Sequence, residues 1–178
     1  LSSLVAALIQ ADAGLVDLLQ TDGPFTVFAP TNQAFADLLD ALGSDYNSLA
    51  DFDTTEEKEL LATILKYHVV AAQALSTDLS DGQIITTAQG EDVTVSLTGG
   101  VFIQDATDDD AEVTAADIMA SNGVVHLVNK VLLPQAVVDA LMPNIVELAQ
   151  DTADLSSLVA ALIQADAGLV DLLQTDGP

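Results

Sequence analysis

One stretch of 24 residues occurs twice in this chain. Residues 1–24 recur without a single change as residues 155–178, an offset of 154 residues from position 1 to position 155. A period this long corresponds to a whole domain and not to one unit of a solenoid. One domain has a single place for each of its segments, so the second copy is predicted to begin another domain or to pack on a neighbouring chain. An engineered permutation with a duplicated tail is the alternative.

The chain is strongly acidic, with 28 acidic residues against three basic ones and a formal net charge of −25. Such a surface repels phosphate backbones and anionic membranes, so nucleic acid is excluded as a partner. The longest apolar runs, such as Leu4–Ile9, are far below the ~18 residues that span a bilayer, which argues against direct membrane insertion. There is no cysteine, which excludes disulfides and thiolate metal sites. No signal peptide opens the chain, as expected of an internal slice of a longer protein.

Residues 25–35 combine a strand, a turn and the start of a helix. Phe25–Phe28 alternates as a strand does, and Pro30, which cannot donate to a ladder, is predicted to end it. Thr31 or Asn32 then caps a helix that extends to Leu42. Helices are also predicted over residues 2–11 and from Thr54 or Thr55 to Lys66.

The second half of the sequence changes to a strand-like period. Short strands are predicted over residues 84–87, 93–97, 101–103, 113–117 and 124–133, with Gly99-Gly100 as a hairpin turn. Helices followed by strands indicate an α+β domain.

Three motifs resemble those of the fasciclin domain family. Residues 26–35 resemble its first signature, Tyr67-His68 matches its Tyr-His motif, and residues 122–134 are similar to its second signature, with Asn129 in the place of the usual acid. The resemblance covers residues 1–134 and implies the fasciclin fold, a short-stranded β-sandwich or wedge flanked by a bundle of N-terminal helices. It implies structural roles for Thr26, Phe28, Pro30, Thr31, Asn32, Phe35, Tyr67, His68, Asn122, Gly123 and His126.

In that family a helix precedes the segment that opens this chain, and residues 144–150 supply such a helix ahead of the second copy. We therefore predict a fasciclin-like domain lacking its first helix over residues 1–134, a short helical linker over 135–143 and the first helices of the next repeat over 144–178. Apolar side chains do not stay loose in water. The predicted contacts between repeats are Ile145, Leu148, Leu155, Leu158, Val159, Leu162 and Ile163.

The sequence contains no motif that predicts catalysis. His68 and His126, its two histidines, lie in apolar strand contexts and are interpreted as core residues bonded to the backbone. No serine elbow, zinc-binding helix or phosphate loop is present, so no catalytic residue and no cofactor is predicted. Residues 105–112 are the densest acidic run, and Asp105, Asp108, Asp109 and Asp110 are candidates for weakly bound Ca²⁺. A solvated turn of mutually repelling charges is the alternative.

Asp117-Ile118 resembles the Asp-Ile segment to which integrin binding is ascribed in animal fasciclin-domain proteins, although Ala115-Ala116 replaces the preceding Glu-Pro. The two residues are therefore adhesion candidates. The structural alternative is that Ile118 fills the core and Asp117 caps a turn.

Together these observations favour an extracellular adhesive repeat of microbial origin. Its fasciclin domains would form a head-to-tail array or filament in a matrix or biofilm. The partners would be neighbouring copies, in the same chain or in adjacent subunits, and cell-surface or matrix components. The alternative is a fasciclin module that binds a small apolar ligand or a polysaccharide without polymerising, for which five Phe, two Tyr and no Trp offer few stacking surfaces.

Overall fold

The computed structural model describes residues 1–11, 14–43 and 46–141. Residues 1–138 form one compact unit, and a second unit begins at Asp139. The α-helices are α1 (Ser2–Ala11), α2 (Leu15–Leu19), α3 (Asn32–Leu42), α4 (Thr55–Tyr67) and α5 (Gln135–Leu141), and the short 3₁₀ helices are η1 (Leu49–Asp51) and η2 (Ser76–Asp78). The strands are β1 (Phe25–Pro30), β2 (Val69–Val70), β3 (Ile84–Thr86), β4 (Asp92–Ser96), β5 (Phe102–Gln104), β6 (Ala111–Ala120) and β7 (Gly123–Val128).

The helix starts follow from local capping. The Thr31 hydroxyl accepts the backbone N–H of Ala34 at 3.2 Å, which satisfies one of the free donors at the start of α3. Thr54 and Glu57 form a reciprocal capping box at the start of α4. The predicted helices over residues 2–11 and 32–42 are confirmed, and α4 extends one residue past its predicted end.

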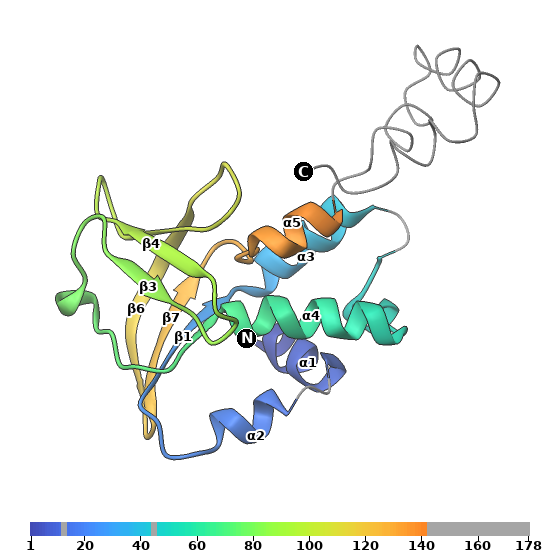
Figure 1. The fold of residues 1–178 in the computed structure, drawn as a ribbon, viewed down its shortest axis with the longest axis horizontal. Helices are drawn as coiled ribbons and strands as arrows, with labels where there is room; N and C mark the ends of the chain where they lie inside the picture. Colours follow the sequence, from blue (N-terminus) through green and yellow to red (C-terminus); the bar gives the residue numbers. More distant parts are fainter. Residues whose placement is uncertain (12–13, 44–45, 142–178) are drawn as a thin grey trace, which may run out of the picture. The chain divides into compact units, whose positions relative to one another are not determined.

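The strands form one seven-stranded mixed sheet in the order β2-β1-β7-β6-β5-β4-β3. β1 and β7 pair in parallel, with Phe25 opposite Gly123 and Phe28 opposite His126, and the other neighbours are antiparallel. Figure 1 shows the sheet on one side of the unit and α1, α3 and α4 on the other. The α+β prediction and the Gly99-Gly100 hairpin between β4 and β5 are confirmed.

The core consists of two clusters, one on each face of β1 and β7. Side chains from all seven strands, including Phe28, Ile85 and Val128, share one cluster, so the sheet must curve around them. The second cluster lies between the helices and the opposite face of β1 and β7, and contains Phe35, Leu61 and Val137 of α5. Helices and sheet therefore bury a common apolar layer.

Strand β7 ends at Val128, five residues before the predicted end at Leu133. Asn129 still contacts β6, because its side-chain oxygen and backbone N–H both bond to the backbone of Glu112. Beyond it, side chains accept the backbone donors: His68 accepts from Leu132, and Asp105 accepts from Leu133. The apolar run continues past the strand because residues 131–133 enter the core as a loop.

Candidate functional site

The Asp117-Ile118 segment lies on an irregular part of β6. The register with β7 shifts between Ala115 and Ile118, and Asp117 has a φ of 57°, a left-handed conformation that aspartate tolerates better than most residues. The Asp117 carboxylate accepts hydrogen bonds from the backbone N–H of Ser76, at 2.8 Å, and from the Ser76 hydroxyl. These two bonds hold the pKa of Asp117 below its usual value. Asp117 of β6 therefore bonds the first backbone N–H of η2, at Ser76.

The exposed part of this segment is apolar. Ile118 is 44% exposed and Met119 is 62% exposed. The prediction that Ile118 fills the core is wrong, because the bulge shifts the alternation of inward and outward side chains along β6. The Asp117 carboxylate is hydrogen-bonded to Ser76. The side chains that this segment exposes to solvent are therefore those of Ile118 and Met119.

The two histidines are buried and bonded to the backbone through both ring nitrogens. In His68, Nε2 accepts the N–H of Leu132 at 2.9 Å, so Nδ1 carries the proton and donates to the carbonyl of Ile64 at 2.7 Å. Burial lowers the pKa of His68 to about 4, although the bond to Ile64 and the charge of Asp105 oppose the shift. His68 is therefore neutral and links α4 to the loop after β7.

His126 makes the equivalent link from the sheet. Its Nδ1 accepts the N–H of Asp117 at 3.2 Å, so Nε2 is protonated and donates to the carbonyl of Ala74 at 2.8 Å. The ring stacks on Phe28, with 5.8 Å between the ring centroids. The interpretation of both histidines as core residues is confirmed, since each is 1% exposed.

Asn122 and Gly123 attach the N-terminal segment to the sheet. The side-chain amide of Asn122 donates to the backbone carbonyls of Leu19 and Thr21. The backbone carbonyl of Asn122 accepts the N–H of Phe25. A Cβ atom on Gly123 would lie 2.1 Å from the carbonyl oxygen of Phe25. Asn122 and Gly123 thus join residues 19–25 to the β6–β7 turn, and we call this junction the seam. A side chain larger than hydrogen does not fit at position 123.

Two further motif residues tie down neighbouring segments. The Thr26 hydroxyl donates to the carbonyl of Ala72 and accepts the N–H of Ala74, which fixes the loop that follows β2. The Asn32 side chain bonds to the Ser2 hydroxyl and to the N–H of Ser3, so it caps α1 from α3. Phe28, Pro30 and Phe35 are buried in the core.

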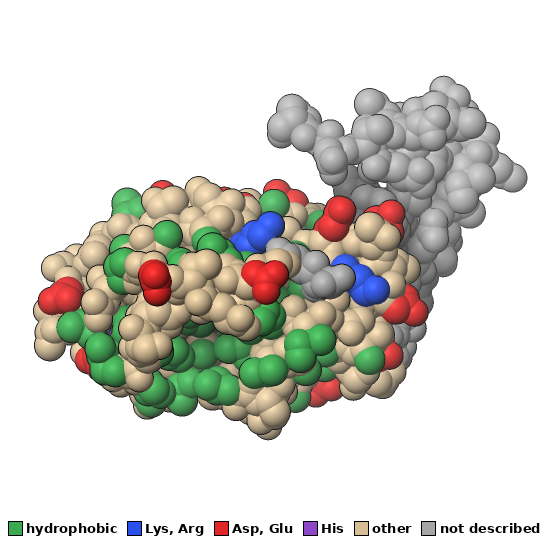
Figure 2. Space-filling view, turned by 90° about the horizontal axis from the view of Figure 1, so that it is seen from below, with side chains coloured by type: hydrophobic (Ala, Val, Ile, Leu, Met, Phe, Trp, Pro, Cys, Tyr) green, Lys and Arg blue, Asp and Glu red, His purple; other side chains and the backbone are tan. Residues whose placement is uncertain are grey.

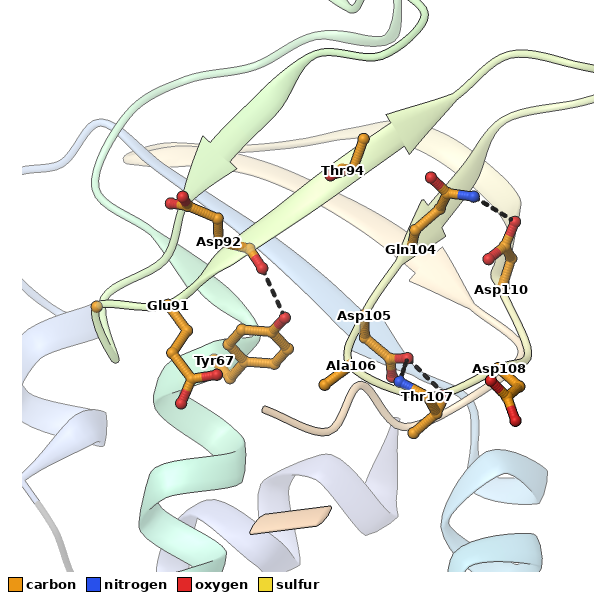
Figure 3. Close-up of a pocket in the computed structure, with 11 residues that line it drawn as sticks. Tyr67, Glu91, Asp92, Thr94, Gln104, Asp105, Ala106, Thr107, Asp108 and Asp110 are labelled. Atoms are coloured by element: carbon orange, nitrogen blue, oxygen red, sulfur yellow. Dashed lines mark hydrogen bonds between the residues drawn. The ribbon is translucent and has the colours of Figure 1, made fainter. Parts of the chain in front are cut away.

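An open groove of about 760 Å³ lies beside Tyr67 and carries acidic side chains on both sides. Figure 3 shows the carboxylates of Glu91 and Asp92 on one side, and those of Asp108 and Asp110 on the other. The Tyr67 hydroxyl donates to the carbonyl of Asp92 at 2.8 Å. Burial, with the charges of three nearby carboxylates, raises the pKa of Tyr67, so the hydroxyl stays neutral.

The calcium candidates do not converge on one point. The buried Asp105 carboxylate accepts bonds from Thr107, from the N–H of Leu133 and from the Lys130 ammonium at 3.3 Å. Asp109 offers its carbonyl to the same ammonium, and Asp110 accepts from the Gln104 amide. Among the described residues, no group of three or more His, Cys, Asp or Glu side chains is arranged to hold a metal ion. Lys130 occupies the centre of this loop.

Replacing Lys130 with methionine is expected to lower the free energy of unfolding by about 1–3 kcal/mol, because the buried Asp105 charge loses its counter-ion. Lys66→Met is the matched control: it also removes one of the three basic residues, but from an exposed position. It is expected to cost less than about 1 kcal/mol. Urea unfolding measures both. Equal losses in the two variants would show that Lys130 acts only through the net charge.

A small apolar groove of about 180 Å³ lies between the end of α2 and the sheet. It is lined by Leu19, Phe25, Val27, Ala120, Asn122, Gly123, Val124 and Val125. Pockets for small organic ligands usually enclose roughly 300–1,000 Å³, so this groove is too small to hold one. That size counts against the alternative of an apolar ligand held between helices and sheet.

The fold and the three motifs are those of a fasciclin domain. The family model for the fasciclin domain matches residues 1–134, and the chain belongs to this family. Protein sll1483 of Synechocystis is 40% identical over 134 residues, which are 75% of this chain and 67% of that protein. The cell surface glycolipoprotein MPB83 of Mycobacterium bovis is 37% identical over 139 residues, which are 76% of this chain and 56% of that protein.

A solved structure shares the fold. It is a pair of FAS1 domains from the insect cell adhesion molecule fasciclin I, with a TM-score of 0.53 and 15% sequence identity. The match covers 97% of this chain and 55% of that chain. The α+β fasciclin fold is thereby confirmed.

Proposed function

We propose that this chain is an extracellular adhesive module that works as part of a head-to-tail array of fasciclin domains. The observation that carries the proposal is the recurrence of residues 1–24 as residues 155–178. The offset of 154 residues from position 1 to position 155 is enough for one fasciclin domain and a linker, since the domain matches residues 1–134. A second copy of the opening segment at that distance is what a chain of repeated domains requires.

The comparisons support an extracellular role. MPB83 is named as a cell surface protein, and the protein with the similar fold is named as a cell adhesion molecule. That solved structure is named as a pair of FAS1 domains in one molecule. None of the helices among the described residues is long and apolar enough to cross a membrane.

The described residues also support a binding and structural role rather than catalysis. Both ring nitrogens of His68 and of His126 are bonded to the backbone, so neither ring is free to transfer a proton to a substrate. The large groove is open and acidic, without the converging groups of an active site.

Electron microscopy of the 178-residue chain tests the array. We expect particles in which globular beads repeat along a line at a regular spacing. Removing residues 144–178 is expected to leave single beads, because unit 1 is compact without them but has lost the second copy. Unchanged assembly of the shortened chain would contradict the proposal.

A further inference from the structure

The two faces of the central strands β1 and β7 are not equally buried. On the face toward the curved sheet interior, Thr26, Phe28, Val124 and His126 are all at most 1% exposed. On the opposite face, toward the helices, Phe25 and Val27 of β1 and Val125 and Leu127 of β7 are only half-buried. The groove beside Leu19 opens onto this second face. Strands at the centre of a sheet are normally covered on both faces, and here the helices pack on this second face without burying it as fully as the first.

The helices next to this face also expose apolar side chains. Val5 and Ile9 of α1, and Leu1 just before the helix, are spaced four residues apart and are 54%, 67% and 49% exposed. On α2, Val16 and Leu18 are 37% and 40% exposed. Leu8 of α1, Val27 and Val125 all pack against the same buried cluster, so α1 and this face of the sheet share one apolar layer. We call these residues of α1, α2, β1 and β7 the apolar face.

Figure 2 shows the corresponding side of the molecule, with α2 toward the viewer. Hydrophobic side chains gather there in one broad band, and both lysine and acidic side chains lie near its border. The groove between α1 and α4 lies at this border and is lined by Lys58, Lys66 and the acidic Glu59, together with Ala11. Neither lysine is ion-paired to a described residue. A contiguous apolar patch rimmed by polar groups marks an interaction site.

We propose that the apolar face is the docking site for residues 144–150 of a second copy of this chain. The inference rests on the proposed array and names the surface through which it forms. Residues 144–150 place Ile145, Val146, Leu148 and Ala149 at helical spacing on one side. Glu147 within the segment, and Asp151 and Asp154 just after it, supply carboxylates for the two lysines at the border, while the apolar side chains of the segment match those of the face.

The repeat explains why this segment is the occupant. Residues 144–150 lie directly upstream of residues 155–178, which are identical to the segment that forms α1 and α2. Only four residues, 151–154, separate the amphipathic segment 144–150 from the second copy. That copy contains Val159 and Ile163, the counterparts of the exposed Val5 and Ile9. Residues 1–24 are already held by Asn122 and by the close approach of Gly23 to the Asn122 carbonyl. The segment of a second copy therefore adds to α1 without replacing it.

Sedimentation velocity on the full 178-residue chain, over a concentration series, tests this docking. Ile9→Glu removes the acceptor surface, and Ile145→Glu removes the donor segment. Each variant alone is expected to stay monomeric, with the dissociation constant raised about 30-fold or more. An equal mixture of the two is expected to form 1:1 dimers and nothing larger, because only one working donor and one working acceptor remain. Ile9 is exposed, so circular dichroism should show an unchanged fold.

Ile163→Glu is the matched control. Ile163 is the counterpart of Ile9 in the second copy and has the same neighbours in sequence, so the substitution is chemically identical. It is expected to leave assembly unchanged. Loss of assembly with Ile163→Glu but not with Ile9→Glu would overturn the inference, because the tail would then displace residues 1–24.

The remaining outcomes separate the inference from the proposed array. If the unmodified chain and the Ile9→Glu variant assemble equally well, the apolar face is not the docking site, and the array stands on another contact. If the unmodified chain stays monomeric at every concentration and Ile145→Glu lowers its stability, the segment folds back on its own chain. That result would overturn docking to a second copy.

Discussion

Replacing Gly123 with alanine is expected to lower the free energy of unfolding by about 4 kcal/mol or more, a large part of the roughly 5–15 kcal/mol that stabilises a typical domain. The new Cβ atom would lie 2.1 Å from the carbonyl oxygen of Phe25 and 3.0 Å from its nitrogen. Both atoms belong to the backbone of the adjacent parallel strand, so no side-chain rotation relieves the clash. Strands β1 and β7 would have to separate at Phe25 and Gly123, the first pair of their register.

Gly100→Ala is the control for this prediction. Gly100 lies just before β5, and a Cβ atom there would lie 3.1 Å from a ring carbon of Phe102, a side chain that can move. We expect this variant to lose less than about 1 kcal/mol. Urea unfolding followed by circular dichroism measures both variants. If the free energy of unfolding of Gly123→Ala were within about 1 kcal/mol of that of the unmodified protein, the close approach of Gly123 to the Phe25 backbone would be contradicted.

The same seam shows which parts of the fold can be predicted from sequence. Helices α3 and α4 are predictable because their signals are local: Thr31 caps one, and Thr54 with Glu57 caps the other. The pairing of Phe25 with Gly123 is not local. Nothing in either stretch indicates that parallel partner, and only the resemblance to a family identifies Asn122-Gly123 as important.

The candidate site shows a second limit. Two register shifts between Val113 and Ile118 change which side chains of β6 face outward, and alternation read from the sequence cannot detect them. The acidic run is a similar case. Its composition is typical of a cation site, but Lys130, which lies 25 residues from Asp105 in the sequence, donates to Asp105, Thr107 and Asp109 within this loop, and the run itself gives no sign of that partner. The predicted inter-repeat residues, from Ile145 to Ile163, lie outside the described residues.

The other large effect expected is a loss of stability in mild acid caused by His68. Its pKa in the folded chain is about 4, because the ring is buried, against an ordinary value of 6.5. As the pH falls, the unfolded chain therefore takes up this proton first. The contribution of neutral His68 is complete above pH 6.5 and is lost as the pH falls to about 4. The full loss is about 3 kcal/mol, with about 2 kcal/mol already lost at pH 5.

His68→Gln tests this prediction, because glutamine does not titrate. The variant is expected to be less stable at pH 7, since it loses the bonds to Ile64 and Leu132, but its stability should change little between pH 7 and pH 5. Asp117 and Glu57, whose pKa values are also shifted, do not affect this comparison between pH 7 and pH 5. Hydrogen bonds, chiefly from Ser76 and Thr54, lower their pKa values from 3.8 and 4.5, so their contributions are present above those values and are lost only in stronger acid. Urea unfolding at pH 7, 6 and 5 gives the slope of the free energy of unfolding against pH for the unmodified chain and for His68→Gln. Equal slopes in the two proteins would show that His68 is not the group that titrates.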